Sequence, residues 1–212
     1  MRLSLLLAAA LLGACAEMRT PPAASRVPAG LGVMAADPVP AMAADAARVI
    51  GTGRGLQGRT GEVARAIGQM ELVTQALTGD ARWGALPVAV NAEITPARLE
   101  WRSVLGIRAG ATPDAAAAAL GQVAIATGRG DTRAAAAALD PAVFDPGGAP
   151  TLARLASPEP LPQTASGARV AAEATQALAA RGLVGVAVAL DPDAGRTNMP
   201  GGPGSEGLPP LR

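Results

Sequence analysis

The sequence predicts an all-helical protein, a small alanine-rich bundle of about five to six helices. Threonine or aspartate stands directly before proline at Asp37-Pro38, Thr95-Pro96 and Thr112-Pro113, the pattern of a helix N-cap followed by proline in the first turn. Glycines follow several apolar segments, as they do where helices end. The apolar residues between these signals recur every three or four positions, which favours helices over strands.

The predicted helices follow one another closely along the chain. The second is the best defined, because Val63, Ile67, Met70 and Leu77 make one apolar face. The fifth cannot pass Asp140-Pro141, since proline breaks a helix interior. The six helices are expected at 38–50, at 60–77, from Thr95 through Trp101 and Leu105, from Thr112 to just before Gly128, from Asp131 or Thr132 to Asp140, and at 168–181.

Two segments of the domain are harder to assign. Residues 145–167 are rich in proline and glycine and predict a surface loop, with one helical turn near Leu152 to Ala156 as an option. Leu183 to Leu190 is apolar and β-branched, so a strand and a buried helical end both fit it. A strand would need a partner, for which Leu86 to Val90 is the candidate.

The ends of the chain differ in composition from its centre. Residues 1–14 are expected to be a signal peptide, 15–37 a flexible proline-containing tether, 38–190 the helical domain, and 191–212 a disordered tail rich in glycine and proline. The start has the form of an export signal, because a basic Arg2 precedes an apolar stretch too short to cross a bilayer, which needs about 20 residues.

The end of this leader carries the most specific motif of the chain. Leu12-Gly13-Ala14-Cys15 resembles the lipobox of bacterial lipoproteins, in which a leucine stands three residues before an obligatory cysteine. The resemblance covers residues 1–15 only. It implies that a diacylglyceryl group is attached to the Cys15 sulfur, that the chain is cut between Ala14 and Cys15, and that the new amino group is acylated.

The same resemblance implies a place in the cell. Ala16 is not the aspartate associated with retention at the inner membrane, so we expect the periplasmic face of the outer membrane. The chain would then be bound to the membrane through its covalent lipid. An envelope protein is the second partner that we expect. The sequence does not indicate an oligomeric state. Ordinary secretion, or a buried helix formed by residues 1–12, are the alternatives.

Composition excludes many chemistries. The chain has no His, Lys or Tyr and one Cys, so a Ser-His-Asp triad, a Schiff-base lysine and a His/Cys zinc site cannot be built. Its 18 basic residues are all Arg and are scattered against 17 acids, which argues against nucleic-acid binding. We therefore expect no catalytic residue, no metal and no cofactor.

Two motifs match known signatures by spacing alone. Residues 53–58 have the G-x-G-x-x-G spacing of a dinucleotide-binding turn, but the residues before them predict a helix rather than the strand such a turn follows. Arg129-Gly130-Asp131 spells an integrin-recognition tripeptide, and we interpret it as a helix end followed by a helix cap.

The sequence is compatible with three functions. The first is a non-enzymatic envelope lipoprotein that is structural or binds a partner. The second is a periplasmic ligand-binding lipoprotein with a pocket near Trp83 and Trp101, although tryptophans in such a bundle more often form the core. The third is a carboxylate-dependent enzyme acting on cell-wall glycans. Its candidate acids, which we otherwise interpret as solvated positions on helix faces, are Glu62, Glu71, Glu93 and Glu100.

Overall fold

The computed structural model describes residues 27–33 and 35–185, in which helices are joined by turns and short loops. The all-helical prediction is confirmed, with seven α-helices and no strand in these ranges rather than five or six helices. The helices are α2 (Pro38–Ile50), α3 (Thr60–Gly79), the 3-10 turn η1 (Ala81–Trp83), α4 (Val88–Leu105), α5 (Pro113–Gly128), α6 (Thr132–Ala137), α7 (Gly148–Ala156) and α8 (Pro162–Ala180).

Three of the predicted helix starts are confirmed by their capping hydrogen bonds. The Asp37 side chain accepts from the Val39 amide, and Pro38 is the first residue of α2. The Thr112 hydroxyl caps α5 and the Asp131 carboxylate caps α6 in the same way. Each cap gives a partner to an amide that has none within its own helix.

The prediction for α4 was wrong at its start. The helix begins at Val88 rather than Thr95, and Pro96 lies inside it. Proline removes one backbone hydrogen bond, but the Ala92 carbonyl that loses its donor belongs to an exposed residue and can be solvated. The hydroxyl of Thr95 donates to the carbonyl oxygen of Asn91, the residue before Ala92. The alternative strand at Leu86 to Val90 is likewise wrong.

The predicted loop 145–167 was also wrong in part, because α7 and the first turns of α8 lie within it. Pro150 and Pro162 occupy first turns, where the missing amide hydrogen costs no intrahelical bond. Gly182 lies just after α8, as predicted. Residues 183–185 form a turn, whereas 186–190 and the predicted tail lie outside the described residues.

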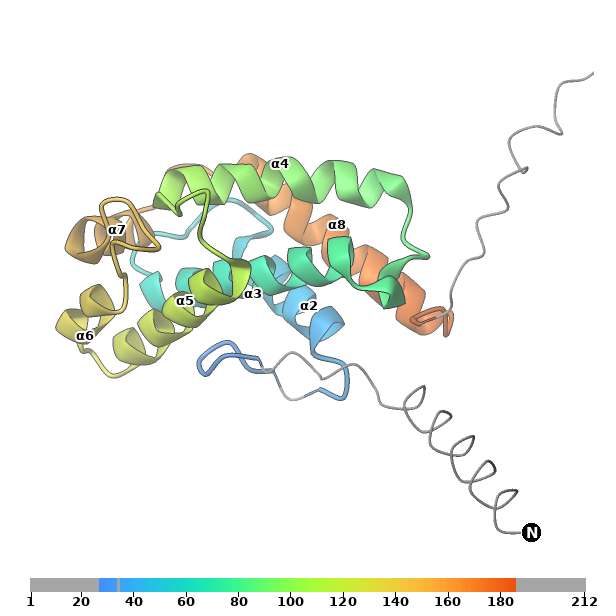
Figure 1. The fold of residues 1–212 in the computed structure, drawn as a ribbon, viewed down its shortest axis with the longest axis horizontal. Helices are drawn as coiled ribbons and strands as arrows, with labels where there is room; N and C mark the ends of the chain where they lie inside the picture. The colour runs from blue at the N-terminus through green and yellow to red at the C-terminus, as the bar shows by residue number, and fades with distance from the viewer. Residues whose placement is uncertain (1–26, 34, 186–212) are drawn as a thin grey trace, which may run out of the picture.

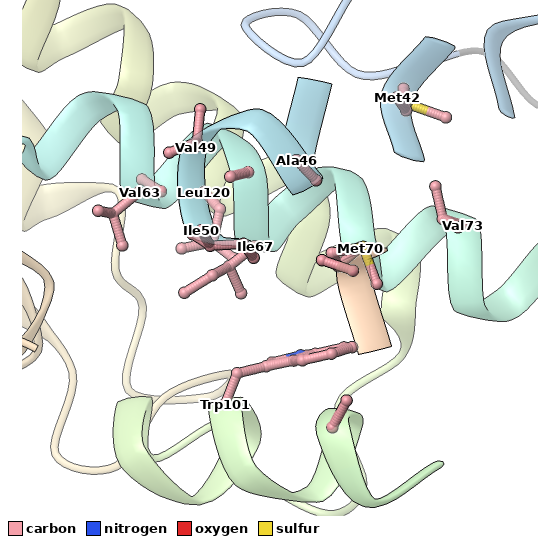
Figure 2. Packing of buried hydrophobic residues seen from close by; sticks show 14 of the residues in the cluster. Met42, Ala46, Val49, Ile50, Val63, Ile67, Met70, Val73, Trp101 and Leu120 are labelled. Carbon is pink, nitrogen blue, oxygen red and sulfur yellow. The ribbon is translucent and has the colours of Figure 1, made fainter. Parts of the chain in front are cut away.

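Helix α3 lies at the centre of the bundle. It packs against α2, α4 and α5, while α8 lies against α2 and α4, and α6 and α7 close one end (Figure 1). The core is a single cluster built from all of these helices. Figure 2 shows the indole of Trp101 on α4 reaching toward Ile67 and Met70 of α3, with Ile50 and Leu120 above.

A short segment before α2 packs onto this core, although it was expected to be part of the tether. This segment, the strap (residues 27–33), buries Leu31 completely. The Gln69 side chain donates to the Leu31 carbonyl oxygen over 3.1 Å. A methyl group at Gly121 would overlap the Ala29 carbonyl oxygen, and one at Gly68 would press on Leu31. Two glycines on neighbouring helices thus make the groove that holds the strap, so the tether prediction extended too far into the chain.

Candidate functional site

Three of the four candidate acids hold parts of the helical frame together. Glu62 pairs with Arg59 at the start of α3, with 2.6 Å between Oε2 and Nη2. Glu100 on α4 accepts hydrogen bonds from the backbone amide and the hydroxyl of Thr164, both at 2.6 Å, and so caps α8 from a neighbouring helix. Glu93, seven residues or about two helical turns before Glu100 on α4, accepts from the hydroxyl of Ser166.

The fourth acid, Glu71, is fully buried, so its interpretation as a solvated position was wrong. Arg102 donates to both carboxylate oxygens, Nε to Oε1 and Nη2 to Oε2, each over 2.8 Å. The Trp101 indole donates to Oε1 over 2.7 Å, and the Arg98 guanidinium lies 3.5 Å from Oε2. Arg102 also donates to the Ala111 carbonyl oxygen, which ties the turn before α5 to this cluster.

A signal for the burial of Glu71 was present in the sequence. It lies four residues after Ile67 and eight after Val63, which places it on the apolar face of α3. Charges in such a place need partners, because an isolated buried carboxylate is strongly unfavourable. Arg98 and Arg102, themselves four apart on α4, supply them. The cluster therefore joins α3 to α4 through hydrogen bonds and ion pairs.

Both candidate tryptophans are core residues. Trp83 is 1% and Trp101 is 0% exposed, and both belong to the hydrophobic cluster. Neither lines the cleft described next. In the described residues, both side chains are packed into the core rather than placed along that cleft.

A cleft that no motif in the sequence predicted opens between two helices of the bundle. It has a volume of about 580 Å³ and lies between the start of α3 and the end of α5, beside the strap. We call it the α3–α5 cleft. Glycines and threonines make much of its wall, and its lining is Gly30, Gly58, Arg59, Thr60, Gly61, Glu62, Arg65, Ala124, Ile125, Thr127, Gly128, Gly130 and Thr132.

Glycines shape this cleft in two ways. Gly61 lets α3 approach α5, because a methyl group there would overlap the Thr127 hydroxyl. Gly128 and Gly130 leave the opposite wall bare, since a side chain at either would meet nothing within 4 Å. The space exists because the two helix ends meet in the tertiary structure, so spacing along the chain carried no sign of it.

The charged groups at the cleft are arranged in pairs. Arg65 lies 3.1 Å from Asp45 of α2, which also accepts from Arg48 and Gln69. Burial alone would raise the pKa of Asp45, but these two hydrogen bonds and the charge of Arg65 outweigh it and hold the pKa below its ordinary value. The hydrogen bond from Arg59 likewise lowers the pKa of Glu62. Both acids are therefore ionised at neutral pH and act as counter-charges.

Residues 53–58 and 129–131 have structural roles. The first segment joins α2 to α3, so a helix rather than a strand precedes its glycines. In the second, Arg129 ends α5 and Asp131 caps α6.

Residues 27–33 and 35–185 contain neither a cluster of metal ligands nor a membrane-spanning helix. In these ranges no three His, Cys, Asp or Glu side chains come together in a way that would hold a metal ion. None of the helices described is both long and apolar enough to pass through a membrane. Cys15 and the motif residues Leu12, Gly13 and Ala14 lie outside the described residues. Comparison with protein families, curated proteins and solved structures found no match to this chain.

Proposed function

We propose that this chain is a lipid-anchored protein of the bacterial envelope whose helical domain acts by binding a partner rather than by catalysis. The observation that carries the proposal is the Leu12-Gly13-Ala14-Cys15 motif, followed after eleven residues by a strap that packs onto a folded domain. The cysteine is the only one in the chain, so it has no disulfide partner within it.

Lipid on Cys15 would be enough to hold the domain permanently. Each buried methylene contributes about 0.8 kcal/mol, so one acyl chain binds only marginally, whereas two or three anchor a protein for practical purposes irreversibly. By the analogy drawn from Ala16, the anchor lies in the periplasmic face of the outer membrane.

The roles of the carboxylates support binding over catalysis. A glycan hydrolase needs one acid to donate a proton and a second to act as base or nucleophile. Here Glu71 is enclosed by Arg102 and Trp101, and Glu100 is occupied by the first turn of α8. Each of these acids already serves the frame of the bundle.

The anchor is tested by replacing Cys15. Wild-type chain should incorporate labelled palmitate and fractionate with the envelope, and Cys15→Ser should do neither. Ser25→Ala, a change of one oxygen atom nearby, is the matched control and should behave as wild type. The anchor is disproved if wild-type chain takes no label or is released in soluble form.

The binding role is tested by affinity purification of tagged chain from detergent-solubilised envelope. A partner recovered in stoichiometric amount should bind again when both purified proteins are mixed. Failure of every recovered candidate to bind the purified chain would count against a binding role.

A further inference from the structure

The α3–α5 cleft lies where the chain from Cys15 meets the domain. Gly30 of the strap lines the cleft, and Val27, the first described residue, is three positions earlier. Twelve residue steps separate Cys15 from Val27, and a chain of that length spans at most about 40 Å. If Cys15 carries lipid, the membrane surface therefore lies within about 40 Å of Val27.

The fold also gathers positive charge at this end. The described residues carry equal numbers of Arg and acidic residues, thirteen each, so the domain as a whole is neutral. Arg59 and Arg65 line the cleft, and the exposed Arg129 and Arg133 adjoin its glycine wall at the turn between α5 and α6.

The acids near these arginines cancel only part of this charge, since Asp45, Glu62 and Asp131 stand against five arginines when Arg48 is included. Glu62 and Asp45 pair with the two lining arginines, but Asp45 is shared between Arg48 and Arg65. Asp131 caps α6 and keeps its own negative charge, between Arg129 and Arg133 in the chain. Within the part of the chain that the structure describes, neither Arg129 nor Arg133 takes part in a salt bridge.

We propose that this arginine-bearing end of the α3–α5 cleft rests on the anionic phospholipid headgroups of the membrane that holds Cys15. The inference rests on the proposed lipid anchor. Guanidinium groups bind phosphate oxygens through paired hydrogen bonds, and their attraction to a charged surface acts within a Debye length of about 8–10 Å. The anchor keeps the local headgroup concentration high, so a contact that is weak alone would still be populated. The bundle would then stand with α4 facing away from the membrane (Figure 1).

The orientation is measured on the full chain, purified with its lipid from the envelope and reconstituted in vesicles. One set of vesicles is phosphatidylcholine and the other adds phosphatidylglycerol; both contain a lipid with a quencher on its headgroup. A fluorophore is placed on Gly128→Cys in the cleft wall, where an added Cβ atom would meet nothing within 4 Å. The matched label is on Leu99→Cys of α4, which is 68% exposed.

Quenching should be several-fold stronger at position 128 than at position 99 in the anionic vesicles, and this difference should shrink in phosphatidylcholine and at high salt. The double variant Arg129→Glu/Arg133→Glu should abolish the difference while leaving the thermal unfolding curve intact. Arg181→Glu, which changes an exposed arginine at the end of α8, should preserve it.

Different results would disprove the proposed lipid anchor and the proposed orientation. Lipidated Cys15 has no free thiol, so wild-type chain should not react with the fluorophore; a reactive Cys15 would overturn the anchor and the orientation with it. A blocked Cys15 combined with equal quenching at the two positions, or with quenching that ignores phosphatidylglycerol, would overturn the orientation alone.

Discussion

The buried carboxylate of Glu71 offers the sharpest test of how this bundle is held together. Glu71→Gln keeps the shape of the side chain but removes its charge. Arg102, whose side chain is only 12% exposed, would then face a neutral amide across a distance set for two hydrogen bonds. One of its donors would meet the NH₂ group of the new glutamine instead of an oxygen.

The expected loss is large because the charge left behind is almost enclosed. Removing one partner of a buried ion pair costs about 3–5 kcal/mol, a large share of the 5–15 kcal/mol that holds a typical domain folded. For a domain of about this size, each kcal/mol lowers the melting temperature by roughly 2–4 °C, so the variant should melt about 6–20 °C below wild type.

The measurement is thermal unfolding of purified chain in mild detergent, followed by far-ultraviolet circular dichroism and by tryptophan fluorescence. Fluorescence reports locally, because the Trp101 indole donates to Glu71. Glu93→Gln is the matched control, since Glu93 is exposed and accepts one long hydrogen bond from Ser166; it should change stability by less than about 0.5 kcal/mol. If the Glu71→Gln chain has the same melting temperature as the Glu93→Gln control, a structural role for the cluster is refuted.

Three further outcomes follow from the structure. Glu100→Ala should cost about 1–2 kcal/mol in urea denaturation, because it removes the cap of α8; a loss below about 0.3 kcal/mol would contradict that role. Leu31→Ala should cost about 2–5 kcal/mol because Leu31 is fully buried, whereas Val88→Ala, at an 84% exposed residue, should be near neutral; equal effects would mean that the strap does not pack as described. The pKa of Asp45 is lower in the folded chain than in the unfolded one, so its stabilising effect is complete above the unfolded pKa of about 3.9 and is lost as pH falls through the folded value. Asp45→Asn should therefore unfold with a weaker dependence on pH below about 5 than wild type, and an unchanged dependence would contradict this.

Much of the helical frame could be predicted from local signals. Asp37-Pro38, Thr112-Pro113 and Asp131 mark helix starts because a side-chain oxygen next to the first turn satisfies an amide wherever the helix later packs. Proline was the signal most easily misread. Pro96 lies inside α4 and Pro150 inside the first turn of α7. A proline is tolerated where its missing amide hydrogen would make no helical hydrogen bond, or where the carbonyl that loses its donor can be solvated.

The candidate site could not be predicted in the same way. Arg59 and Arg65 are near Gly128 and Gly130 only because α3 and α5 meet at one end of the bundle. The burial of Glu71 had a helical-spacing signal, but its partners lie about thirty residues further along the chain, on another helix.

By itself, then, the sequence determined the helical class, most helix starts and the chemistries that lack their residues. These properties depend on residues within four positions of one another in the sequence and on composition. Packing between helices changes neither. Only the tertiary structure decided that the strap belongs to the domain, that Glu71 is enclosed, and that a cleft lined by Arg59 and Arg65 opens between α3 and α5. The physical reason is that burial and charge clustering depend on contacts between helices distant in sequence, and glycines such as Gly61 and Gly121 set how closely those helices approach.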